Sequence, residues 1–87
     1  MSVYMVERSL GGITMDQLAA AQRSAIDTAA QMSREAAPVR YIRSTFVPES
    51  GQCQCLFEAA DADTIASLNH TAGLPFDRIV AALDLTP

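Results

Sequence analysis

The order in which two hydrophobic periods follow one another constrains the fold of this chain more than any other feature. Four segments have the β-branched, aromatic or alternating composition of strands: residues 3–8, 39–47, 53–59 and 78–85. Two segments repeat apolar residues every three to four positions, as amphipathic helices do: residues 15–37 and 61–73. The sequence therefore predicts the element order β-α-β-β-α-β.

Capping residues mark the ends of these helices. Thr14 followed by Gln17 three residues later matches a capping box, so the first helix is expected to begin at this point. Asp61 or Asp63 suits the start of the second helix, and Gly73 suits its end. The two helices are thus bounded by sequence signals as well as by their periodicity.

The predicted order is that of the split βαβ, ferredoxin-like α+β fold. Two right-handed crossovers place both helices on one face of a four-stranded antiparallel sheet. A chain of 87 residues is long enough for one such domain, residues 1–87. A domain this small leaves much of its surface exposed, and association with a second copy would cover more of it.

Composition and charge exclude several classes of partner. The net charge of -4 and the absence of a basic patch argue against nucleic acid. No apolar run approaches the roughly 18 residues of a membrane span, and residues 1–10 lack the pattern of a signal peptide. We therefore expect a cytoplasmic protein that binds neither nucleic acid nor membrane.

Strand alternation divides the predicted sheet into two different faces, because successive side chains point in opposite directions. One face is almost wholly apolar and is expected to receive the helices: Tyr4, Val6, Ile42, Phe46, Cys53, Cys55, Phe57, Ile79, Ala81 and Leu83. The other face is mixed: Met5, Glu7, Tyr41, Arg43, Thr45, Gln54, Leu56, Glu58, Arg78, Val80, Ala82 and Asp84. A mixed face suits packing against a second sheet around a polar pocket, which predicts a homodimer through the sheet face.

Cys53 and Cys55 fall on the apolar face, where free cysteine behaves as a small hydrophobe. The alternative is a soft-metal or redox pair, but a tetrahedral site needs further ligands and the chain has no other cysteine. Two strand steps separate them by about 6.6 Å, near the upper limit for a disulfide. We expect two reduced, buried thiols.

The carboxylates of the mixed face are the sharper candidates for chemistry. Glu7 and Glu58 lie on strands that are neighbours in this topology, and two enclosed carboxylates need a cation, a shared proton or an arginine. A divalent metal ion or Arg43 could fill that role, and a purely structural Glu–Arg network is the alternative. Tyr41 and Gln54 could line the same pocket as ligand contacts, or merely pack at an interface.

His70 is the only histidine, and the helical period turns it about 200° away from Leu68. It is expected to be exposed, so a role as a metal ligand would require a partner subunit or an adjacent loop. No serine–histidine–acid arrangement is apparent, although a buried Glu7 or Glu58 could serve as a general base. The sequence leaves enzymatic activity open.

Four segments together resemble one family: MVER, VRYIRS, CLFEA and AGLPFDRIVAALDL. They are similar to a family of small uncharacterised bacterial domains with a ferredoxin-like, dimeric α+β-barrel fold, which includes a nickel-binding protein. The resemblance implies this fold, a homodimer and nickel as the metal. The chain departs from the family pattern in its second helix, where the histidine is His70 rather than a residue near position 68.

Three functions follow from these observations. The first is a divalent-metal-binding homodimer, with nickel implied by the resemblance and Glu7, Glu58 and His70 as the candidate ligands. The second is an enzyme or small-molecule-binding dimer that uses the same pocket. In both, Tyr41, Arg43 and Gln54 are candidate contacts for a bound molecule. The third is a structural dimer without a ligand.

Overall fold

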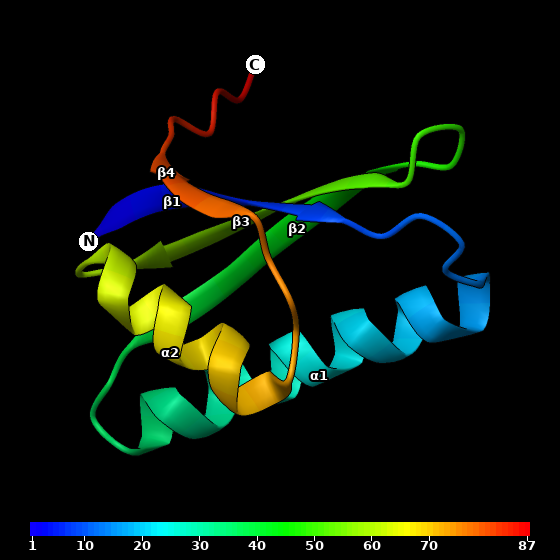
Figure 1. Cartoon of the computed structure of the whole chain (residues 1–87). Helices are drawn as coiled ribbons and strands as arrows, with labels where there is room; N and C mark the ends of the chain where they lie inside the picture. The colour runs from blue at the N-terminus through cyan, green and yellow to red at the C-terminus, as the bar shows by residue number, and fades with distance from the viewer.

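A computed structural model describes all residues 1–87 and has the predicted order of elements. The strands and helices are β1 (Ser2–Ser9), α1 (Met15–Arg34), β2 (Val39–Val47), β3 (Gln52–Ala59), α2 (Ala62–Ala72) and β4 (Arg78–Ala81) (Figure 1). The prediction of a ferredoxin-like α+β fold is confirmed.

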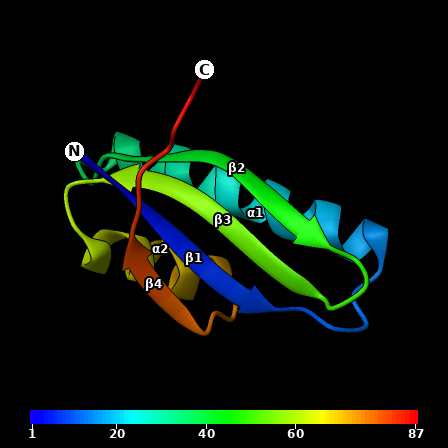
Figure 2. The same ribbon diagram turned by 90° about the horizontal axis from the view of Figure 1, so that it is seen from above.

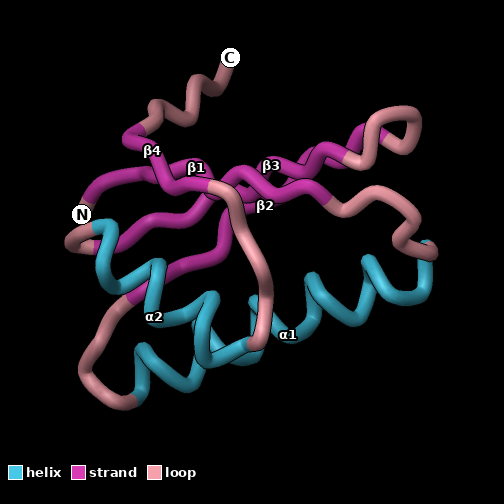
Figure 3. Tube along the Cα trace, viewed as in Figure 1, coloured by secondary structure: helices cyan, strands magenta, loops and turns pink.

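The four strands form one antiparallel sheet in the order β2-β3-β1-β4. Both helices lie against one face of this sheet, as the ribbon and the coloured trace show (Figures 1 and 3). The other face, called the open face below, carries no helix, and the C-terminal segment that follows β4 passes over it toward β2 (Figure 2). The fold therefore has two layers and one uncovered sheet face.

The predicted caps are present at the helix ends. The Thr14 side chain accepts from the Gln17 amide at 3.1 Å, and the Gln17 side chain accepts from the Thr14 amide at 3.0 Å. Asp61, rather than Asp63, begins α2 by accepting from the Thr64 amide at 2.8 Å. Gly73 ends α2 in the left-handed conformation at φ 70°, which glycine adopts without steric cost.

The core lies between β1, β3 and the two helices. Val6, Phe57, Ile65 and Leu68 are fully buried there. Each contributes about 1.5–3 kcal/mol through removal of its side chain from water. β3 is buried at every second residue, from Cys53 through Phe57 to Ala59, as its predicted alternation requires.

The face assignment was wrong for part of β2. Tyr41 pairs with Phe57 and therefore lies on the helix-covered face, whereas Arg43 pairs with Leu56 on the open face. A β-bulge at Ile42 explains the difference, because it inserts one residue between these two pairs and breaks the strict alternation. Tyr41 was expected on the open face, and Ile42 on the covered one.

The last strand is shorter than predicted. It ends at Ala81 instead of Leu85, and Leu83 is 84% exposed rather than buried under the helices. β4 pairs only with β1, and this pairing runs from Glu7 opposite Arg78 to Tyr4 opposite Ala81. The amide of Ala82 makes the last bond, to the Val3 carbonyl at 3.0 Å, and the chain then leaves the sheet.

Gly51 is the glycine whose replacement should damage the fold most. A Cβ at Gly51 would lie 2.6 Å from the Gly11 backbone, and its φ of 76° is left-handed. We expect Gly51→Ala to lower the free energy of unfolding by about 2–4 kcal/mol, through strain and displacement of the 10–12 loop.

Gly73→Ala is the matched control, because Gly73 has φ 70° but open space around its would-be Cβ. Gly73→Ala should lower the free energy of unfolding by only about 1 kcal/mol, through the strain of the left-handed conformation. Urea denaturation of both variants measures the difference. Equal losses would show that the close approach of Gly51 to Gly11 is unimportant.

Candidate functional site

Three arginine–carboxylate pairs lie on the open side of the molecule. Arg78 pairs with Glu7, Arg43 pairs with Asp84, and the Arg40 Nε lies 3.3 Å from the Glu58 Oε1. The arginine side chains are more than half exposed, so each pair is of the solvent-screened kind that contributes little to stability.

Glu7 and Glu58 do not meet on this face. Glu7 lies opposite Gln54, whereas Glu58 lies opposite Val3. Four residue steps along β1 separate these positions, which is about 13 Å along the strand. The antiparallel register, which strand order alone does not specify, keeps the two carboxylates apart.

Glu58 shares its surroundings with Asp84 instead. Both line a hollow of about 560 Å³ on the open side, together with Arg40 and the apolar side chains of Val3, Ile42 and Leu83. Asp84 reaches this hollow because the C-terminal segment crosses above the sheet (Figure 2). The structure therefore brings together one predicted candidate and one carboxylate that was not singled out.

His70 lies on the other side of the molecule. It belongs to α2, which packs on the covered face, and it is exposed as predicted, with its ring centroid 5.8 Å from that of Phe76. No group of three histidine, cysteine, aspartate or glutamate side chains is placed to hold a metal ion. Within one chain, Glu7, Glu58 and His70 are thus too far apart to bind the same metal ion.

The three predicted ligand contacts also lie apart. Arg43 binds Asp84 on the open side, and Gln54 is exposed in the sheet between Glu7 and Thr45. Tyr41 lies on the covered face, where its ring packs edge-on against Phe57 at 5.4 Å. Its hydroxyl lies 2.6 Å from the Ser44 Oγ and accepts from Gln22 at 3.1 Å.

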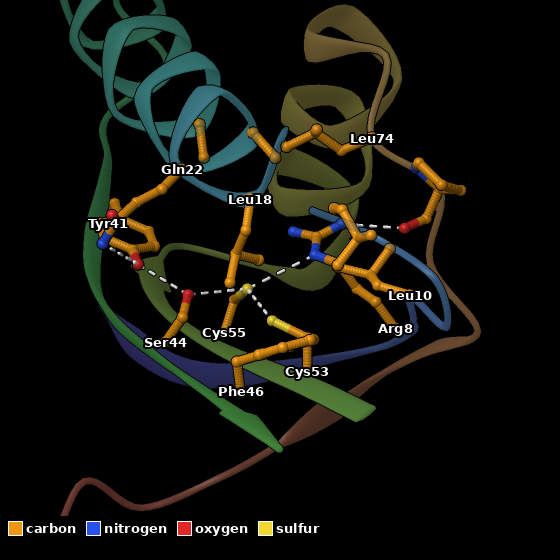
Figure 4. Close-up of a pocket in the computed structure, with 14 residues that line it drawn as sticks. Arg8, Leu10, Leu18, Gln22, Tyr41, Ser44, Phe46, Cys53, Cys55 and Leu74 are labelled. Atoms are coloured by element: carbon orange, nitrogen blue, oxygen red, sulfur yellow. Dashed lines mark hydrogen bonds between the residues drawn. The ribbon is translucent and has the colours of Figure 1, made fainter. Parts of the chain in front are cut away.

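A second hollow, the inner cavity, lies between the covered face and the helices. Its volume is about 380 Å³ (Figure 4). Its wall is largely apolar and consists of Arg8, Leu10, Ile13, Leu18, Ala21, Gln22, Ala25, Tyr41, Ser44, Phe46, Cys53, Cys55, Leu74 and Pro75. Tyr41 is the one predicted site residue that lines it.

Both cysteines lie in this wall as free thiols, with their sulfur atoms 3.8 Å apart. Burial, and after it the neighbouring Cys55, raises the pKa of the Cys53 thiol from 9.0 to about 11. Cys55 accepts from the Ser44 hydroxyl at 2.9 Å and from the Arg8 Nε at 3.4 Å (Figure 4). The expectation of buried, reduced thiols is confirmed.

Arg8 and Asp84 line the two hollows but were not predicted from the sequence as site residues. Arg8 follows Tyr4 and Val6 in the alternation of β1, so the pattern already placed it on the covered face. A charged side chain at an apolar position was the available signal. Asp84 was assigned to the correct side, but its approach to Glu58 depends on the end of β4, which the sequence did not reveal.

Comparison with known proteins identifies the relatives of this chain. Residues 4–81 match the family described as nickel responsive protein SCO4226-like. The chain belongs to this family.

A solved member of the SCO4226-like family has the same fold. The crystal structure of SCO4226 from Streptomyces coelicolor A3(2) superposes with a TM-score of 0.79 and 25% sequence identity, covering 99% of this chain and 100% of the other. No curated protein matches the sequence. The family resemblance predicted from the sequence is confirmed, and nickel responsiveness is the property that the family description names.

Neither helix of this SCO4226-like protein is long and apolar enough to cross a membrane. This agrees with the absence of a long apolar run in the sequence.

The raised pKa of Cys53 predicts slow alkylation in the folded protein, because the thiolate is the reactive form. In the Cys55→Ser variant, which isolates this thiol, burial still disfavours the thiolate, so the folded protein should react with iodoacetamide only at a higher pH than a free thiol does. The same variant unfolded in urea should react readily as the pH passes 9.0.

Mass spectrometry of quenched samples gives both rates. Equal rates in the folded and unfolded protein at pH 8 would contradict the burial of Cys53.

Proposed function

We propose that this protein is a homodimer that binds a divalent metal ion at the open sheet face, with nickel the ion suggested by its family. The observation that carries the proposal is the hollow on that face. There Glu58 and Asp84 line one space beside uncovered apolar side chains. The family description supplies the metal, since it names nickel responsiveness.

The dimer is supported by apolar surface that a single chain leaves uncovered. Leu83 and Leu85 are each 84% exposed on the segment that crosses the open face. Met5, Leu56 and Val80 form an apolar row across β1, β3 and β4 on the same face. Exposed apolar surface rimmed by charged residues is typical of a protein interface. A second copy that packs its own open face here would cover it.

The metal site is supported by the chemistry of the carboxylates. Glu58 and Asp84 supply oxygen ligands, and the exposed arginines that now hold them are weak competitors. One chain lacks three grouped ligands, so we place the ion where two subunits contribute together. Glu7, at the other end of the open face, is a further candidate. His70 is a candidate ligand only if a partner subunit contacts α2.

Sedimentation equilibrium tests the dimer. The wild-type protein should have twice the chain mass of 9.3 kDa. Leu83→Asp combined with Leu85→Asp should yield monomers, because charged side chains would be buried at the interface.

Met15→Asp is the matched control, since Met15 is also exposed but lies on α1. It should leave the dimer intact. A monomeric wild-type protein, or a dimer that survives the double substitution, would contradict a dimer through the open face.

Equilibrium dialysis against NiCl₂ tests the metal. Glu58→Gln combined with Asp84→Asn should weaken nickel binding at least tenfold, because the ion loses two charged oxygen ligands. Glu49→Gln, in the exposed β2–β3 turn, should leave it unchanged. Nickel binding that persists in the double variant would rule out this site, and His70→Ala would then test the helical side.

A further inference from the structure

We infer that the inner cavity is a second binding site, which takes an organic anion with one carboxylate and an apolar body. This inference does not rest on the proposed function, because the cavity lies on the opposite side of the sheet from Glu58 and Asp84. Its volume of about 380 Å³ is within the usual range of small-molecule sites. Gln22 and Pro75 in its wall are themselves exposed, so the cavity is open to solvent.

Arg8 is the residue that gives this cavity its specificity. It is only 3% exposed, yet it takes part in none of the ion pairs of the molecule. Its Nε donates to the Cys55 sulfur at 3.4 Å, and its Nη1 donates to the Pro75 carbonyl at 3.2 Å. Its Nη2 is buried without any partner. A buried charge without a counterion is costly, so this guanidinium is a ready site for an anion.

The geometry favours a carboxylate over a larger anion. A guanidinium presents its donors in a planar fork that matches a carboxylate, and one arm of the Arg8 fork is unoccupied. The Cys55 sulfur, which accepts the hydrogen bond from the Arg8 Nε, is only a weak acceptor. A carboxylate at Nη2 would supply both the missing hydrogen bond and the missing charge.

The rest of the wall selects the body of the ligand. Leu10, Leu18, Phe46 and Leu74 surround the space next to Arg8 (Figure 4). The polar groups of Tyr41, Ser44 and Gln22 are already joined in one hydrogen-bonded chain, so few of their donors are free. A ligand with a polar head at Arg8 and an apolar remainder fits this distribution.

Isothermal titration calorimetry with decanoate, well below its micelle-forming concentration, tests the proposal. One molecule of decanoate should bind per chain, whereas decanol, which has the same chain without the charge, should bind at least tenfold more weakly. Arg8→Met keeps the length of the side chain and removes its charge. It should weaken decanoate binding roughly tenfold or more while removing the preference over decanol.

Arg78→Met is the matched control, because Arg78 is an exposed arginine of the open side. It should bind decanoate like the wild-type protein. Absence of decanoate binding to the wild type, or equal binding by wild type and Arg8→Met, would overturn the proposal.

A second variant keeps the test independent of how well Arg8→Met folds. Ala21→Phe should fill the cavity from α1 and abolish decanoate binding, whereas Ala20→Phe, at an exposed neighbouring position, should not. Binding that survives in Ala21→Phe would place decanoate outside the cavity and refute the assignment. Nickel dialysis on the same variants should be unchanged, so failure here is distinguishable from failure of the metal proposal.

Discussion

β3 is the strand on which the rest of the structure depends, because it pairs with both β1 and β2 and carries the most regular alternation in the chain. Burying Cys53, Cys55, Phe57 and Ala59 beneath the helices forces Gln54, Leu56 and Glu58 onto the open face. The same alternation separates two kinds of surroundings. One is an apolar cavity around a single buried arginine, and the other is a charged, uncovered sheet. Both proposals follow from this division.

The arginines on the two sides of the sheet differ in whether a carboxylate compensates their charge. On the open side each arginine has a carboxylate and is largely exposed, so these pairs are easily exchanged for other ligands. In the inner cavity Arg8 is desolvated and its Nη2 has no partner, so any anion that enters compensates a charge that the fold leaves unsatisfied. A metal ion is therefore suited to the open side and an organic anion to the interior.

Much of the fold could be predicted from the sequence, because its signals are local. The capping box at Thr14 and the alternation of β3 needed no tertiary information. The β-bulge at Ile42 and the early end of β4 could not be predicted, since the first depends on how β2 fits beside β3 and the second on how far β4 stays paired with β1. Those two features moved Tyr41 to the covered face and left Leu83 exposed. The neighbourhood of Glu58 was missed for the same reason, as its approach to Asp84 requires the chain to leave the sheet at Ala82.

A crystal structure of the protein grown with nickel, with anomalous scattering data collected at the nickel edge, tests the proposed metal site and the proposed dimer most directly. We expect an anomalous peak on the open side of the sheet, within ligand distance of Glu58 or Asp84 and between two subunits. A peak beside His70 on the helical side would contradict the proposed metal site, and sheets that face solvent instead of each other would contradict the proposed dimer.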